Sequence, residues 1–174
     1  AASDVYKRQQ SFWQILMNKH KPEEIIENLL KSNGIFEPPI PIKKIVTEET
    51  PLRIVQAIFK DNTISGFIDP CSNLIYVNKI EPYVRQRFTI AHELGHWMLH
   101  QSQAGLLEEV FYRKDSYTEE NSLKIMEKEA DDFAENLLVP LYMLEKFRNL
   151  EIYKIADIFQ VTKKLIESRM KDYK

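Results

Sequence analysis

The residues from Arg87 to His100 have the periodicity of an amphipathic helix and contain the sequence His-Glu-Leu-Gly-His at positions 92–96. Two histidines that are four positions apart lie on one side of a helix, one turn apart, so His92 and His96 can bind the same metal ion. Glu93 follows the first histidine and can act as a general base without filling the coordination sphere. This is the arrangement of zinc metalloproteases, and it predicts a fold built around one metal-binding helix.

A zinc hydrolase usually supplies three protein ligands and leaves one position for water. The metzincin pattern would require glycine at position 99 and histidine at position 102, where this chain has Leu99 and Ser102, so that class is excluded. His100 lies one turn beyond His96, too far along the helix axis for tetrahedral closure. We therefore expect His100 to be a structural residue at the helix end.

The third ligand is expected from a second helix, which contains the sequence Glu-Lys-Glu-Ala-Asp-Asp at 127–132. Glu129 shares a helical face with Phe133, and a carboxylate at the edge of an apolar face is poorly solvated unless it is paired or metal-bound. Glu129 is therefore the predicted third ligand, the alternative being a surface glutamate in a charged helix. Glu127 points away from this face and is predicted to be solvated.

Two supporting roles stay open at the level of sequence. A carboxylate that accepts the second ring N–H of a ligand histidine fixes its tautomer. Asp131 and Asp132 are both candidates for this role, and Asp132 lies nearer to the predicted ligand face. An additional donor to a developing oxyanion could come from Tyr112, Tyr117 or Tyr142.

The composition is that of an ordinary globular domain, with 174 residues of which 44% are hydrophobic and 29% are charged. A chain of this length forms one domain with a real core. The net charge of −2 gives no reason to expect nucleic acid or an anionic membrane as a partner, and no apolar stretch is long enough to span a membrane. The single cysteine, Cys71, provides no disulfide framework, so we expect a cytoplasmic protein.

The rest of the pattern alternates predicted helices with predicted strands. Apolar stripes predict helices at 22–33, 42–46, 82–100, 117–139, 150–160 and 162–172, and residues rich in Ile, Val and Phe predict strands at 52–60, 64–68 and 74–78. The short turns between the strands predict an antiparallel meander. The fold class is therefore α+β: a zincin-like single domain whose small antiparallel sheet packs on the motif helix and the second, ligand-bearing helix.

Three segments are expected along the chain. Residues 1–9 read as a non-native segment, residues 10–145 as the zincin-like metallopeptidase domain, and residues 146–174 as a helical tail. The tail has eight basic and four acidic side chains, which suggests DNA binding. Lys163 and Lys164 are its only close basic pair, however, so a hairpin packed on the core is favoured over partner recognition, and direct DNA binding is the weakest of the three readings.

Two separated motifs appear together in the order typical of one peptidase family. They are residues 85–96, which end in the histidine motif, and residues 127–140, which end in Leu-Leu-Val-Pro. With these motifs the chain resembles the ImmA/IrrE family of metallo-endopeptidases over about residues 22–172. Asp131 and Val139 stand where that family often has Asn and Met.

The resemblance implies a gluzincin-like site in which His92, His96 and Glu129 bind Zn²⁺ and Glu93 is the general base. It also implies a helix-turn-helix-like C-terminal tail, and regulatory proteolysis in the cytoplasm, typically of a helix-turn-helix transcriptional repressor. The alternative is a zinc-binding sensor, or an antitoxin- or toxin-type protein that binds its partner without turnover. The substrate, the activating signal and the oligomeric state stay open.

Overall fold

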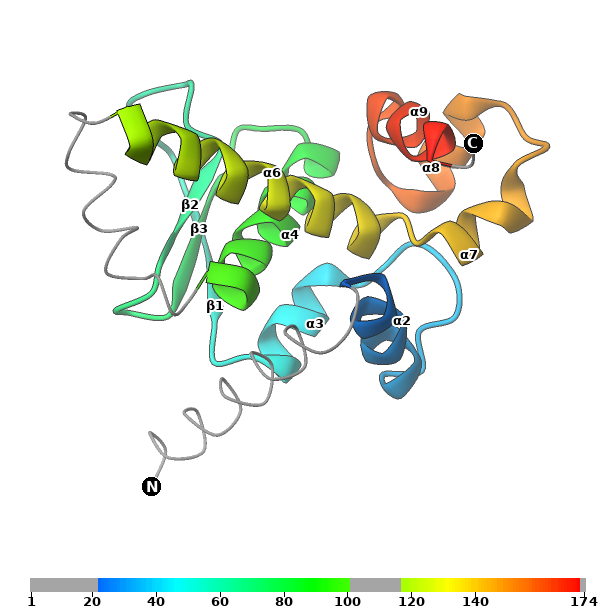
Figure 1. The fold of residues 1–174 in the computed structure, drawn as a ribbon, viewed down its shortest axis with the longest axis horizontal. Coiled ribbons are helices and arrows are strands. Elements are labelled where there is room, and N and C mark those ends of the chain that lie inside the picture. Colours follow the sequence, from blue (N-terminus) through cyan, green and yellow to red (C-terminus); the bar gives the residue numbers. More distant parts are fainter. Residues whose placement is uncertain (1–21, 101–116, 173–174) are drawn as a thin grey trace.

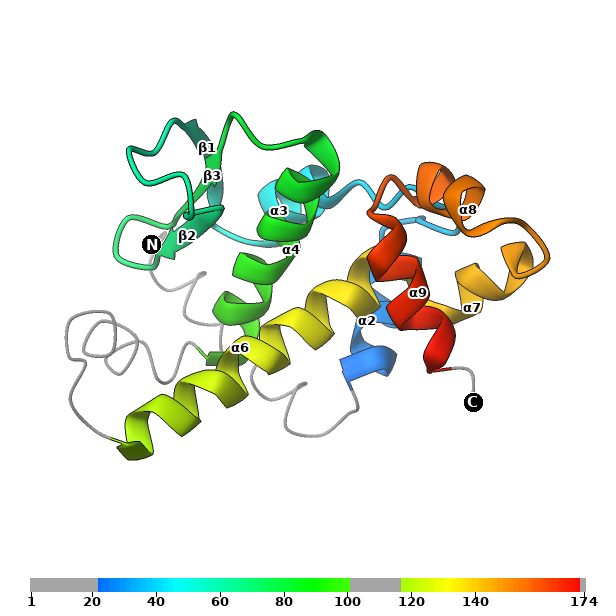
Figure 2. The same cartoon turned by 90° about the horizontal axis from the view of Figure 1, so that it is seen from above.

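The computed structural model describes residues 22–100 and 117–172 and combines helices with one small sheet, which confirms the α+β class. The elements, in chain order, are α2 (Pro22–Ser32), α3 (Ile42–Glu49), β1 (Arg53–Ala57), β2 (Gly66–Asp69), β3 (Leu74–Asn78), α4 (Tyr83–His100), α6 (Tyr117–Leu138), α7 (Leu141–Leu144), the 3-10 helix η2 (Glu145–Phe147), α8 (Ile152–Phe159) and α9 (Lys163–Lys171). Figures 1 and 2 show α4 and α6 crossing in the middle of the molecule, between the sheet and the pair α8 and α9.

The sheet is mixed, so the predicted antiparallel meander is wrong. Its strand order is β1-β3-β2, with β1 parallel to β3 and β2 antiparallel to β3. The ends of β1 and β3 meet where Ala57 pairs with Asn78, and β2 begins nearby because Gly66 pairs with Val77. Residues 58–65 therefore pass over the end of β3 rather than forming a tight hairpin. This connection places β2 at the far edge of the sheet, next to α4.

The contact between the sheet and α4 depends on a glycine. A Cβ atom at Gly66 would lie 2.4 Å from the carbonyl oxygen of Tyr76 and 2.5 Å from Cγ2 of Thr89. Any side chain at this position would therefore push β2 away from both β3 and α4. The absence of a side chain lets the strand lie directly against the motif helix.

The last two helices share the core of the rest of the chain. Ile155, Phe159 and Ile166 are fully buried in the same hydrophobic cluster as Leu94 and Phe133 of the crossing helices. The predicted boundary between residues 145 and 146 thus falls within one continuous core, and the division into a domain and a tail stays a prediction. The predicted tail helices at 150–160 and 162–172 correspond to α8 and α9.

Two buried arginines connect these helices to the central ones. Arg87 of α4 donates from Nε to the carbonyl oxygen of Gln160 at 3.1 Å and from Nη2 to that of Ile40 at 2.7 Å. Arg169 of α9 donates from Nε to the carbonyl oxygen of Val139 at 3.1 Å. Each guanidinium donates to backbone carbonyl groups near helix ends, which an apolar side chain could not do.

Some predictions lie outside the described residues. They include the predicted non-native segment 1–9 and the candidate oxyanion donor Tyr112. Among the described helices, none is both long enough and apolar enough to cross a membrane.

Candidate metal centre

The side chains of His92, His96 and Glu127 converge at the crossing of α4 and α6. Their ligand-type atoms all lie within 4.8 Å of one another, and the described residues contain no other such group of three or more His, Cys, Asp or Glu side chains. The two Nε2 atoms are 3.0 Å apart. The Glu127 carboxylate lies 3.3 Å from Nε2 of His92 through one oxygen and 3.3 Å from Nε2 of His96 through the other.

These separations fit a bound metal ion. In a tetrahedral zinc site with bonds of about 2.0–2.1 Å, neighbouring ligand atoms lie about 3.3 Å apart. The 3.0 Å between the two Nε2 atoms, and the 3.3 Å from each of them to a different oxygen of Glu127, are close to that edge length. Two imidazoles and one carboxylate are also the donor set that catalytic zinc sites use, with a fourth position left for water.

The structure does not bring the predicted third ligand, Glu129, together with His92 and His96. Its Oε2 atom instead lies 2.9 Å from Nε2 of His100, at the end of α4. Glu127, which was predicted to be solvated, faces both motif histidines although its side chain is 55% exposed. The prediction chose the carboxylate at the edge of the apolar face of α6, whereas the carboxylate that faces both imidazoles lies two positions earlier, where α6 crosses α4.

One of the two aspartates considered as a partner for a ligand histidine does contact one. Asp131 Oδ1 lies 2.8 Å from Nδ1 of His92. A carboxylate in this position holds the proton on Nδ1 and leaves Nε2 free to bind a metal. Asp132, which the sequence favoured for this role, follows Asp131 in the chain. Its side chain instead lines a surface hollow with Glu129 and Asn136.

Glu127 and Asp131 could have been found from their spacing. They are four positions apart on α6, just as His92 and His96 are four positions apart on α4. Two carboxylates one turn apart, facing two imidazoles one turn apart, form matching pairs across a helix crossing. Spacing alone, however, does not say which residues of α6 lie opposite the two histidines of α4. The apolar face of α6 pointed to Glu129 instead of Glu127.

Glu93 is buried, with 7% of its surface exposed. Burial raises the pKa of its carboxyl group, while the charges of His92 and His96 act in the opposite direction. The backbone N–H of Ile68 in β2 donates a hydrogen bond to the carboxylate. A carboxylate with a raised pKa is a stronger base, which suits a group that must accept a proton from water.

The electrostatics of the metal-free site centre on His92 and Glu127. Burial lowers the pKa of His92, but hydrogen bonds to Asp131 and Glu127 and the charge of Glu93 outweigh this effect and raise it to about 10. Hydrogen bonds from His92 and His96 hold the pKa of Glu127 well below its ordinary value. Without a metal, His92 is therefore held in its protonated form beside the ionised carboxylate of Glu127, and a metal ion bound by His92 would have to displace that proton.

The predicted oxyanion donors are not placed at the site. Tyr112 and the side chain of Tyr117 lie outside the described residues. Tyr142 lies on α7, where burial and the charge of Glu27 in α2 raise the pKa of its hydroxyl group.

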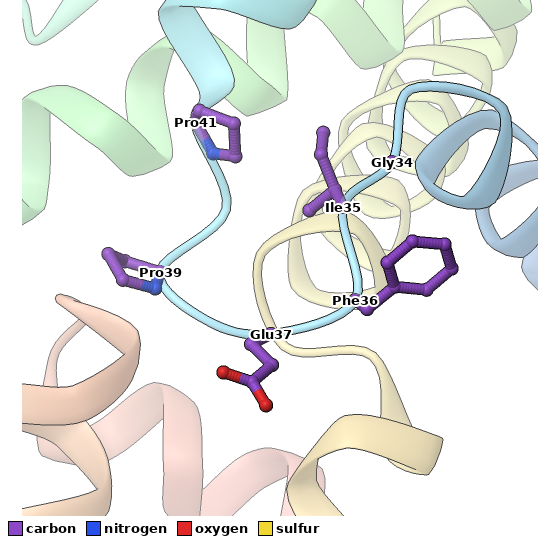
Figure 3. Close-up of a pocket in the computed structure, with 6 residues that line it drawn as sticks. All are labelled: Gly34, Ile35, Phe36, Glu37, Pro39 and Pro41. Carbon is purple, nitrogen blue, oxygen red and sulfur yellow. The ribbon is translucent and has the colours of Figure 1, made fainter.

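A separate surface hollow of about 560 Å³ lies beside the segment that joins α2 and α3 (Figure 3). Its lining residues are Gly34, Ile35, Phe36, Glu37, Pro39 and Pro41. With one carboxylate and no histidine, this lining does not provide a second metal site.

Comparison with known proteins gives a family and a fold. The model of a peptidase family described as "IrrE N-terminal-like domain" matches residues 47–171. A solved structure of a Mycobacterium tuberculosis transcriptional regulator superposes with a TM-score of 0.64 at 17% sequence identity, covering 92% of this chain and 50% of that one. The chain thus spans half the length of that regulator. No curated protein sequence matches it significantly.

Proposed function

Since the chain belongs to the IrrE N-terminal-like peptidase family, as the resemblance to the ImmA/IrrE enzymes predicted, we propose that it is a zinc-dependent endopeptidase. One observation carries the proposal: His92, His96 and Glu127 place three ligand-type atoms within 4.8 Å of one another beside the buried Glu93. In the proposed assignment the first three bind Zn²⁺, and Glu93 is the catalytic base.

The chemistry divides between the ion and the chain. A zinc ion bound there would act as a Lewis acid that polarises the scissile carbonyl and lowers the pKa of water. The Glu93 carboxylate accepts the proton of the attacking water and delivers it to the nitrogen of the leaving amine. Asp131 keeps His92 in the tautomer that presents Nε2 to the ion.

The proposal is tested by replacing Glu93 with Gln, which keeps the shape of the side chain and removes the base. We expect E93Q to bind zinc as the unaltered chain does and to lose about 10²- to 10⁴-fold in cleavage rate. The matched control is E135Q, which neutralises a half-buried glutamate on α6 and is expected to cleave normally. Cleavage by E93Q at the normal rate would contradict the role of Glu93.

The proposed substrate is a helix-turn-helix transcriptional repressor in the cytoplasm. The family resemblance supports this choice, as does the fold shared with a solved transcriptional regulator. The sequence has one cysteine, which fits a reducing compartment. The substrate is tested by incubating the zinc-loaded chain with the product of an adjacent gene, if that gene encodes a helix-turn-helix repressor, and mapping the cleavage products by mass spectrometry.

A second candidate is a zinc-binding sensor that binds its partner without cleaving it. The observation in its favour is the shared fold with a transcriptional regulator, which associates this architecture with regulation rather than with turnover alone. The two candidates differ in one outcome. A sensor would bind the repressor equally well with Glu93 or Gln at position 93 and would leave it intact in both cases.

A further inference from the structure

We infer that His100 and Glu129 form a hydrogen-bonded relay that positions His96 for metal binding. The inference rests on the proposed metal site and adds two positioning residues to it. His96 Nδ1 lies 3.2 Å from Nδ1 of His100, and Nε2 of His100 lies 2.9 Å from Oε2 of Glu129. The relay therefore runs from the metal site along the end of α4 to a carboxylate on α6.

The direction of each hydrogen bond follows from what the ring nitrogens can do. If Nε2 of His96 binds a metal, its proton must be on Nδ1, and that N–H needs an acceptor. The nearby Nδ1 of His100 can accept only when it carries no proton, which requires the tautomer protonated on Nε2. Glu129 accepts a hydrogen bond from that Nε2–H and so selects the required tautomer.

Burial makes this partner necessary. His96 and His100 expose 6% and 3% of their surfaces, so water has little access to the Nδ1 atoms between them. Without His100, the N–H of His96 would lose its acceptor inside the protein, which is unfavourable for a buried donor. The Glu129 side chain is 55% exposed, so it can be replaced without disturbing the core.

The two ligand histidines are then supported in different ways. His92 donates directly to Asp131, whereas His96 reaches its carboxylate through a second imidazole. Both carboxylates lie on α6, as does the ligand Glu127, two positions away from Glu129. The same helix thus supplies a ligand and the orienting groups for both histidines, which explains why α4 carries a third histidine on the same side.

The test is a double-mutant cycle read by metal affinity rather than by activity. Zinc dissociation constants are measured by competition with a chelating indicator for the unaltered chain, H100F, E129A and H100F/E129A. We expect each single variant to bind zinc about 10- to 100-fold more weakly. We also expect the double variant to bind no more weakly than H100F, because Glu129 acts only through His100.

Two further variants separate positioning from charge. E129Q keeps an oxygen that can accept from His100, and we expect it to retain more affinity than E129A. D132N removes a carboxylate from an exposed position on the same helix and is expected to leave the affinity unchanged. The visible spectrum of bound Co²⁺ gives a second readout, since a rotated His96 would alter the geometry around that ion.

Each outcome decides a different question. Unchanged affinity in E129A, which depends on no buried packing, would overturn the relay even if H100F failed to fold. Additive losses in the double variant would overturn it too, since Glu129 would then act on the ion by charge. If the unaltered chain bound no zinc, the proposed function itself would fail, and the relay would fail with it.

Discussion

Gly95 of α4 lies directly against the backbone of Ala130 in α6. A Cβ atom at Gly95 would lie 3.2 Å from both the Cα and the carbonyl oxygen of Ala130, and 3.1 Å from the ring of Phe133. Gly95 lies between His92 and His96 in the sequence, and its lack of a side chain lets α4 and α6 approach closely at this point. The glycine of the histidine motif therefore lets Glu127, three positions before Ala130, come near the two imidazoles.

Replacing Gly95 with Ala should weaken both the fold and the site. Overpacking at the crossing is expected to cost about 1–3 kcal/mol of unfolding free energy, more than the roughly 0.5–1 kcal/mol that alanine gains as a helix former. Zinc affinity should also fall, by about tenfold, because Glu127 is moved away from the imidazoles. Urea unfolding and a zinc titration measure the two effects. A variant as stable as the unaltered chain, with equal affinity, would contradict this role of Gly95.

Asp131 should matter as a hydrogen-bond acceptor more than as a charge. D131A is expected to bind zinc about 10- to 100-fold more weakly because His92 loses the partner that fixes its tautomer. D131N keeps an oxygen that can accept from the same N–H and should lose less than tenfold. D132A, a change at the adjacent residue, serves as the control. Equal losses in D131N and D131A would show that the charge is what matters.

Zinc binding should become stronger as the pH rises. The pKa of His92 in the metal-free chain is raised to about 10, so at neutral pH a metal ion must displace a proton from this ligand. Below that value, each unit by which the pH rises should therefore increase the apparent affinity about tenfold. Titrations between about pH 6 and 8 test this expectation. An affinity that does not change over that range would contradict the raised pKa.

The same titrations in D131N provide a control for the cause. Removing the carboxylate of Asp131 takes away one of the groups that raise the pKa of His92. The proton is then released at a lower pH, and the affinity should level off earlier than it does in the unaltered chain.

Arg87 should be essential for stability rather than for chemistry. It is 3% exposed and donates to two backbone carbonyls, those of Ile40 and Gln160. R87M removes both of these hydrogen bonds, although the carbonyl oxygen of Ile40 still accepts from the N–H of Ile42 at 2.8 Å. We expect a loss of about 2–5 kcal/mol in unfolding free energy. R85M is the matched control, because Arg85 is exposed and lies 3.8 Å from Glu81 in a surface ion pair, which is expected to contribute less than about 1 kcal/mol.

The sequence predicted the parts of the site that lie within one helix. The spacing of His92 and His96 specifies one face of α4 because a helix has a fixed period. It could not specify the third ligand, because Glu127 and Glu129 lie on different sides of α6 and the choice depends on how α6 crosses α4. That crossing is set by the contact at Gly95, which involves residues far apart in the chain.

The order of the strands in the sheet could likewise not be predicted from local sequence patterns. The predicted strand at 74–78 matches β3, because an alternation of buried apolar residues is a local signal. The parallel pairing of β1 with β3 depends on the path of residues 58–65 across the end of β3. The turn residues in that segment suggested a hairpin, and no local pattern distinguishes a hairpin from such a connection.

The most direct test of the whole account is anomalous diffraction at the zinc absorption edge from crystals of the zinc-loaded chain. We predict one strong peak within about 2.0–2.2 Å of Nε2 of His92, Nε2 of His96 and a carboxylate oxygen of Glu127, with Glu129 on His100. A zinc ion bound by Glu129 in place of Glu127, or crystals without a peak between the two imidazoles, would contradict it.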